Sequence, residues 1–246
     1  MTSFKTQEQP LYDAVRRRIL EKLQTGEWAA GGRIPTEKEL GSLFSVSVGT
    51  VRKAVEELVS ERVLLRRAGI GTTVAIHTDA HVFDAYFNFV NAAGLRVTPT
   101  SRLLNFKEIG ADDALAQRLN LAKGKTLIRF DNLRLCDDAP AMLDRIWVSR
   151  DRFQGLDKDS FLSRPGSIYG LYQAGFNATV VRIREQVGAS LPLTFVVKAL
   201  KISASLPVLK IERTAFTFGD EVVEYRERYV NSTLCRYQNE TGLKAA

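Results

Sequence analysis

A helix-turn-helix pattern near the start of the chain constrains the fold more than any other feature. Thr36 precedes a short amphipathic stretch and Glu39 follows three residues later, which is the spacing of a helix capping box. Ser47 can cap a second stretch that runs to about Ser60. Because only residues 45–47 separate the two predicted helices, we expect them to cross at a steep angle. That geometry allows a second helix to enter the major groove of DNA.

A first helix and a glycine-rich hairpin flank this pair. Apolar residues recur every four positions after Pro10, at Leu11, Val15, Ile19 and Leu23. After the pair, the segments Val63–Arg67 and Thr72–Ile76 are predicted strands around the turn 68–71, whose glycines permit a positive φ. Three helices followed by such a hairpin predict a winged helix-turn-helix.

The start of the third helix supplies the candidate DNA contacts. Val51, Val55 and Leu58 are predicted to face the core, which leaves an outer set of small, polar and cationic residues: Ser47, Val48, Gly49, Thr50, Arg52 and Lys53. Small residues let the helix approach closely, and hydroxyl groups at the positive helix end suit phosphate. Arg52 can offer a bidentate fork to a guanine edge.

Composition and charge favour a polyanionic partner and exclude several classes of protein. The net charge is +7 and the sequence pI is about 9.5. Cys136 and Cys235 are too few and too distant for a disulfide framework or a zinc motif. We therefore expect the protein to act in the reducing cytoplasm and to hold no cofactor or metal. Uncharged stretches such as Val187–Val197 fall short of the ~20 apolar residues of a membrane span, and Met1–Pro10 is not signal-like.

The length predicts two domains. We place a winged helix-turn-helix at residues 8–76, a polar linker with His77 and His81 at 77–82, and an α+β domain at 83–242. The α+β domain is expected to hold a mainly antiparallel sheet covered by helices on one face. Its predicted strands are Thr98–Lys107, Thr126–Cys136, Ala141–Val148, Thr179–Val187, Val208–Phe218 and Glu221–Val230, and its predicted helices are Val82–Ala93, Asp112–Leu119, Ser167–Ala174 and Pro192–Leu200.

The strings PLYDAVRRRIL, GGRIPTEKELGSLFSVSVGTVRKAVEELV and GIGTTVA resemble the DNA-binding domain of GntR-family transcriptional regulators. The resemblance implies DNA contacts from Lys38, Ser47, Thr50, Arg52 and Gly71. Many members carry Arg or Gln where this chain has Val48. A valine cannot donate to a base, so it would meet a thymine methyl group or contribute little.

The second domain resembles the UTRA effector-binding domain of the HutC branch, which has a chorismate-lyase-like fold. The segments NLRLCDDAP, PGSIYGLY, LPVLKIER and VVEYRERY carry this resemblance. It implies a small metabolite bound between sheet and helices, a homodimer that reads an inverted-repeat operator, and, for most members, repression. The alternatives are a DNA-binding protein without a ligand and a bifunctional protein with a catalytic second domain.

Two charged residues interrupt apolar rows and are candidate effector contacts. Arg134 follows Ile128 and Phe130 on one face of a predicted strand, and Asp144 interrupts the next strand. If the four-residue loop 137–140 sets the register with Cys136 opposite Met142, Arg134 falls directly opposite Asp144. The pair forms either a salt bridge or the lining of an effector site, and the resemblance, which places an Arg and an acid on this hairpin, favours an anionic effector.

The last long strand adds two residues by resemblance, because Glu227 and Tyr229 match the family's pocket region. A two-residue loop at Gly219-Asp220 would set Glu212 opposite Glu227. Like charges in that position cost energy unless Lys210, water or a ligand intervenes. Asn132 stands where sugar-phosphate-binding members often have a second Arg.

Overall fold

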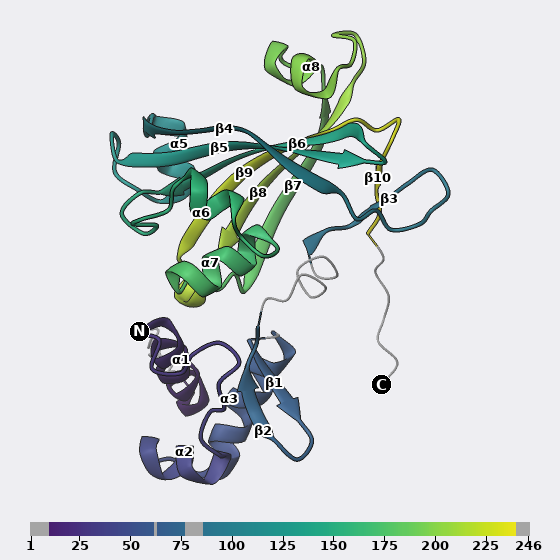
Figure 1. Ribbon diagram of the computed structural model, residues 1–246. Coiled ribbons are helices and arrows are strands. Elements are labelled where there is room, and N and C mark those ends of the chain that lie inside the picture. Colours follow the sequence, from purple (N-terminus) through teal and green to yellow (C-terminus); the bar gives the residue numbers. More distant parts are fainter. Residues whose placement is uncertain (1–9, 62, 77–85, 240–246) are drawn as a thin grey trace, which may run out of the picture.

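The computed structural model describes residues 10–61, 63–76 and 86–239, which form a smaller and a larger domain (Figure 1). The smaller, winged-helix domain comprises residues 10–76. It contains α1 (Leu11–Gln24), α2 (Glu37–Phe44), α3 (Val48–Ser60), β1 (Leu64–Arg67) and β2 (Gly71–Val74). The two strands pair antiparallel, so the predicted winged helix-turn-helix is confirmed.

Side-chain caps fix both helices of the helix-turn-helix. Thr36 and Glu39 form the predicted capping box of α2, and Ser47 caps α3 by accepting a hydrogen bond from the backbone N–H of Thr50. Between the helices, Ser45 adopts a left-handed conformation with φ 55°, which ends α2 abruptly. The helices then bury one apolar core that includes Ile19, Leu40, Val51, Val55 and Leu58.

The larger, sheet domain comprises the described residues 86–239. Its main sheet has the order β4-β5-β6-β9-β8-β7, with every neighbouring pair antiparallel. The strands are β4 (Thr100–Gly110), β5 (Thr126–Cys136), β6 (Ala139–Ser149), β7 (Arg182–Ser190), β8 (Val208–Phe216) and β9 (Val222–Val230). The helices are α5 (Asp113–Leu119), α6 (Lys158–Leu162), α7 (Ile168–Phe176) and α8 (Thr194–Leu200).

Helices cover both faces of this sheet, so the prediction of one covered face was wrong. On one face, α6 and α7 pack on a core that contains Phe130, Ile146 and Tyr172. On the other face, α8 and α5 lie toward different ends of the sheet, where Tyr229 and Trp147 anchor separate apolar clusters. The lower helices and the upper α8 are visible on the two sides of the sheet in Figure 1.

The β5–β6 hairpin turns in two residues rather than the four predicted. Asp137 and Asp138 have φ values of 49° and 60°, and Cys136 pairs with Ala139. Positive φ at both central positions is typical of a type I′ turn, whose twist matches that of the flanking strands. Strand β6 therefore begins at Ala139 rather than at the predicted Ala141, whereas β5 has its predicted bounds.

This shorter turn and a bulge change the predicted register. The register shifts between Arg134 and Leu135, so Arg134 lies opposite Met142 rather than Asp144. Asn132 takes the place opposite Asp144. Residues two apart share a face, so Arg134 and Asp144 remain diagonal neighbours on one side of the sheet.

The prediction of a helix at Val82–Ala93 was wrong from Phe87 onward, and Tyr86 is the only helical residue among its described positions. Residues 77–85, which include the predicted linker and both histidines, lie outside the described residues. Phe89–Val90 forms a short strand, β3, paired with β10 (Arg236–Tyr237). Phe87 and Phe89 both bury their rings in a cluster with Met142, and this tertiary packing outweighs the local helical pattern.

The turn between β8 and β9 joins the two domains. It forms a short helix, η1 (Phe218–Asp220), and Phe218 is 4% exposed because it belongs to the apolar core of the winged-helix domain. Beside it, the Gln24 side chain donates to Glu221 over 3.0 Å. In Figure 1 this turn lies directly above α1. One aromatic ring of the sheet domain thus completes the core of the other domain.

We expect Phe218→Ala to destabilise the winged-helix domain by about 3–5 kcal/mol, the usual cost of removing a buried Phe ring. The chain has two tryptophans, so Trp28 reports on this domain alone in a Trp147→Phe background. Urea unfolding followed by Trp28 fluorescence measures the change. Leu193→Ala, at a position that is 56% exposed, is the control. An unchanged Trp28 transition in Phe218→Ala would show that the domains are not joined in this way.

Candidate DNA-binding surface and effector pocket

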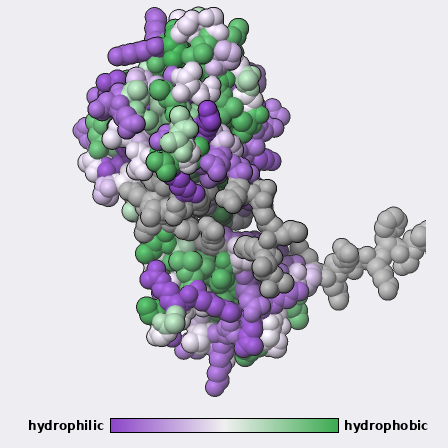
Figure 2. All heavy atoms as spheres, turned by 90° about the vertical axis from the view of Figure 1, so that its right-hand side faces the viewer, coloured by the Kyte–Doolittle hydropathy of each residue, from purple (hydrophilic) through white to green (hydrophobic). Residues whose placement is uncertain are grey.

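The residues predicted to contact DNA lie on the surface of the winged-helix domain. Six of them are exposed and Thr50 is half-buried; the exposed ones are Lys38, Ser47, Val48, Arg52, Lys53 and Gly71. Hydrophilic side chains protrude from the end of this domain that is farthest from the sheet (Figure 2). Val48, at the first position of α3, is 40% exposed. An apolar side chain there is accessible to a thymine methyl group but offers no hydrogen bond.

Two of the cationic residues have partners within the domain. The Lys53 ammonium lies 3.8 Å from the centre of the Tyr12 ring. Arg52 Nε donates to Glu37 Oε2 over 2.9 Å, and Arg66 of β1 donates to the other oxygen of the same carboxylate, also over 2.9 Å. The wing glycine, Gly71, has a φ of 104°, so a side chain there would be strained.

A cavity of about 220 Å³ lies between the sheet, the start of α7 and the segment that leads into β3. Its lining combines aromatic rings with five arginines: Tyr86, Phe87, Thr98, Pro99, Ser101, Arg134, Arg164, Gly166, Ser167, Ile168, Tyr169, Arg213, Arg226 and Arg228. A concave site with few convergent polar groups is the usual form of a small-molecule site.

Asp144 is the centre of the charge network beneath this cavity. Its side chain has no exposed surface and accepts from Arg228 over 2.5 and 2.9 Å, from Arg134 over 2.7 Å and from Arg226 over 3.4 Å. Burial alone would raise the pKa of Asp144, but the three guanidinium groups outweigh it and hold that pKa well below its usual range. Asp144 is therefore a carboxylate at any physiological pH.

A second buried carboxylate links an arginine of the cavity wall to α7. Glu224 of β9 is also fully buried, and both of its oxygens accept from Arg226 over 2.9 Å. The Tyr172 and Tyr169 hydroxyls of α7 donate to the same carboxylate over 2.8 and 3.3 Å. The position of α7 is thus tied to the arginine that lines the cavity.

Arg228 is a buried arginine of the cavity with one donor left unsatisfied by the described residues. It is 2% exposed, and its Nη1 atom has no hydrogen-bond partner among the described residues. Burial lowers the pKa of Arg228 to about 10, and the nearby charges of Arg134 and Arg213 act in the same direction against the attraction of Asp144. An anion in the cavity would relieve this cost.

The cavity holds more positive than negative charge. Among the described residues, four of its arginines, Arg134, Arg213, Arg226 and Arg228, face three carboxylates that are buried or nearly so: Asp144, Glu224 and Glu185, the last of which pairs with Arg213. These four arginines and three carboxylates leave one positive charge in excess. A low-dielectric site with such an excess favours an anionic ligand.

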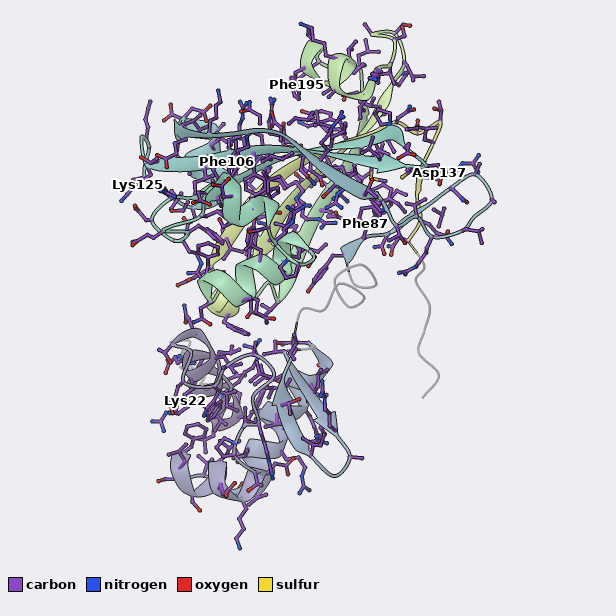
Figure 3. All side chains as sticks on the ribbon, viewed as in Figure 1. Lys22, Phe87, Phe106, Lys125, Asp137 and Phe195 are labelled. Atoms are coloured by element: carbon purple, nitrogen blue, oxygen red, sulfur yellow. The ribbon has the colours of Figure 1, made fainter. Side chains whose placement is uncertain are left out.

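The predicted effector residues do not form one site. Arg134 and Asp144 do meet: they form the predicted ion pair, and Arg134 also lines the cavity. Glu227 and Tyr229 lie on the opposite face of the sheet, where Tyr229 packs against Phe195 of α8. The two labelled rings Phe195 and Phe87 mark these two sides in Figure 3.

The charged side chains on that opposite face have partners close by on the same face. Glu212 lies opposite Glu227 as predicted, and Lys210 lies 3.0 Å from Glu227 and 3.8 Å from Glu212. The Tyr229 hydroxyl donates to Glu227 over 2.8 Å. These charges thus stabilise the sheet, and an effector site built from all four predicted residues is wrong.

Sequence reasoning missed four arginines of the cavity: Arg164, Arg213, Arg226 and Arg228. The sequence feature that could have revealed two of them is the row Glu224, Arg226 and Arg228 on one face of β9. Taken alone, such a row has the polarity of a solvent-exposed face. In a sheet covered on both sides, such a row must instead be buried with its counter-charges.

Two family models match the chain. The model of bacterial regulatory proteins of the gntR family matches residues 11–74, and that of the UTRA domain matches residues 94–235, more than half of the chain. The chain belongs to the GntR family of transcriptional regulators. Its two domains are those of a DNA-binding regulator with a UTRA effector-binding domain, and the family consists of regulators rather than enzymes.

Curated relatives of this GntR regulator match over nearly their whole length. A probable fructoselysine utilization operon transcriptional repressor of Escherichia coli (strain K12) is 27% identical over 90% of both chains. The transcriptional repressor NagR of Bacillus subtilis (strain 168) is 26% identical over 88% of both.

Solved structures show the same fold. The ligand-binding domain of a GntR-family regulator from Bordetella bronchiseptica has a TM-score of 0.61 at 22% identity and covers 64% of this chain and 98% of its own. PhnF from Mycobacterium smegmatis has a TM-score of 0.52 at 21% identity, with 88% and 95% covered. In the described part of this GntR regulator, no helix is long and apolar enough to cross a membrane.

We expect Asp144→Asn to lower the free energy of unfolding by about 3–5 kcal/mol, because it leaves three buried guanidinium groups short of a counter-charge. Arg134→Ala should cost less than half as much, since Arg228 still donates twice to Asp144. Urea unfolding followed by Trp147 fluorescence in a Trp28→Phe background compares the two variants. An equal or larger loss in Arg134→Ala would mean that the Arg134–Asp144 pair alone stabilises this network.

Proposed function

We propose that this GntR regulator represses transcription in the cytoplasm and that an anionic metabolite in the arginine-lined cavity controls its affinity for operator DNA. The excess of positive charge among the described residues of the cavity, where Arg228 Nη1 finds no hydrogen-bond partner, is the observation that carries the proposal. The volume of about 220 Å³ lies below the usual range for drug-sized ligands and suits a small metabolite. The names of the relatives as repressors support the direction of control.

The proposed DNA contacts come from the helix-turn-helix and from the wing. Ser47, Thr50 and Lys53 would meet phosphate groups around the start of α3, and Lys38 would do so from α2. Arg52 would read a guanine edge, and Val48 would lie against a base methyl group. Gly71 would let the wing backbone approach the DNA closely.

We further propose that the chain acts as a homodimer on an inverted repeat, because a two-fold protein requires a two-fold operator. Selection of bound duplexes from a random-sequence library with the full chain identifies that operator. The expected sequence has two half-sites about one helical turn, or a multiple of it, apart. Selection of a single half-site would contradict the dimer.

Two elements connect the cavity to the winged-helix domain. At one end of α7, Ser167 and Tyr169 line the cavity, and at the other end the Asn177 side chain donates to the carbonyl of Gln24 over 3.0 Å. Strand β9 begins directly after η1 and carries Arg226 and Arg228. A ligand that shifts α7 or β9 would therefore act on the orientation of the DNA-binding domain.

Ligand-induced thermal stabilisation tests the effector class. Anionic metabolites, each paired with its neutral analogue, should raise the melting temperature where the neutral partner does not, because a ligand that binds only the folded state stabilises it by mass action. Arg134→Ala should weaken the binding of any hit by about 1.5–3 kcal/mol. Arg16→Ala, which removes a half-buried arginine of α1 that does not line the cavity, is the control. Equal stabilisation by the neutral analogues would refute an anionic effector.

Arg52→Ala tests the base contact. The variant should lose about 1–3 kcal/mol of binding to the selected duplex, the worth of one good bidentate base contact, and little on a scrambled duplex. Fluorescence anisotropy at fixed salt concentration measures both affinities. Equal losses on the two duplexes would mean that Arg52 contacts the DNA backbone only.

A further inference from the structure

One carboxylate joins the recognition helix to the wing. Glu37, at the start of α2, accepts from Arg52 of α3 through one oxygen and from Arg66 of β1 through the other, with both distances at 2.9 Å. The Glu37 side chain is 26% exposed, against 58% for Arg52 and 47% for Arg66. Three elements that are separate in sequence thus converge on a single acidic group.

The atoms used by this contact leave Arg52 able to bind a base. Arg52 donates through Nε, the inner nitrogen of the guanidinium group. The two outer Nη groups form the fork that matches a guanine edge. A free arginine side chain has high rotamer entropy, which a base contact must overcome. A carboxylate that holds Nε reduces this cost before DNA arrives.

An acidic side chain on a DNA-binding surface is unfavourable for the affinity of the protein for DNA. A negative charge close to phosphate groups repels them and lowers binding to any sequence. Isolated ion pairs of exposed side chains contribute little to stability. The ion pairs of Glu37 therefore contribute little to stability, and their geometry instead fits a role in sequence selectivity.

We propose that Glu37 is a positioning residue that orients Arg52 for base recognition and fixes the wing, through Arg66, relative to α3. This proposal rests on the proposed reading of a base by Arg52. It assigns Glu37 an effect that is opposite on two kinds of DNA: it raises affinity for the operator and lowers affinity for unrelated sequences.

Glu37→Gln tests the proposal, with Glu56→Gln as a matched control. Glu56 is also acidic, lies 3.8 Å from Arg66, is 56% exposed and acts on Arg52 through its charge, but among the described residues it accepts no hydrogen bond from either arginine. Both variants remove one negative charge beside the same arginine. Anisotropy with the library-selected duplex and a scrambled duplex gives the selectivity, defined as the ratio of the two dissociation constants, and thermal melts verify folding.

Glu37→Gln should lower the selectivity by about 10-fold, within the range of one base contact, while its affinity for the scrambled duplex stays equal or rises. Glu56→Gln should leave the selectivity within about 2-fold of the wild-type value. If both variants raise affinity for the two duplexes by the same factor, Glu37 acts through charge alone and the proposal is wrong.

A double-mutant cycle separates this proposal from the one on which it rests. In an Arg52→Ala background, Glu37→Gln should cause no further loss of selectivity, because its effect passes through Arg52. A further loss of the same size would show that Glu37 acts independently and would overturn the positioning role. If Arg52→Ala itself leaves selectivity unchanged, the base contact fails; if Arg52→Ala lowers it and Glu37→Gln does not, only the positioning role fails.

Discussion

The burial of Asp144 is the constraint on which the sheet domain depends. A carboxylate without exposed surface is stable in a protein interior only if cations and hydrogen bonds replace its water. Arg134 of β5 and Arg226 and Arg228 of β9 supply these cations and hydrogen bonds. Because Asp144 itself lies on β6, the ion pairs hold the β5–β6 hairpin and strand β9 in one register. The same arginines then form one wall of the cavity. Stability of the sheet and recognition of an anion thus come from a single charge network.

This network extends to the DNA-binding domain through α7 and through the turn before β9. Arg226 holds Glu224, and Glu224 holds two tyrosines of α7. The far end of α7 and the turn before β9 both touch the winged-helix domain, where Phe218 completes the apolar core. A change in the cavity therefore has a continuous packed route to α1, and close-packed interiors transmit such displacements.

The winged-helix domain could be predicted closely from sequence, because its signals are local. Caps such as Thr36 and Ser47 satisfy backbone groups within four residues, and the wing turn needs its glycines. The cavity could be predicted only in part. Arg134 and Asp144 were visible as exceptions in apolar rows, and the family resemblance supported them.

The rest of the cavity depends on tertiary structure. A two-residue turn at Asp137 and Asp138 changed the register, and a strand with alternating polarity does not reveal that helices cover both of its faces. For that reason the charged row of β9 was not predicted to line the site, and Glu227, on the opposite face, was predicted to do so. Resemblance identified the correct strand, but the side-chain alternation decided which residues of it face the cavity.

Hydrogen exchange of the full chain, with and without the library-selected duplex, tests most directly whether the cavity and the DNA-binding domain form one coupled unit. Linkage is reciprocal, so DNA binding must act on the elements of the cavity if the cavity acts on DNA binding. We expect changed protection of backbone amides in α7, in η1 and at the start of β9, besides those in residues 10–76. Changes confined to residues 10–76 would contradict this coupling.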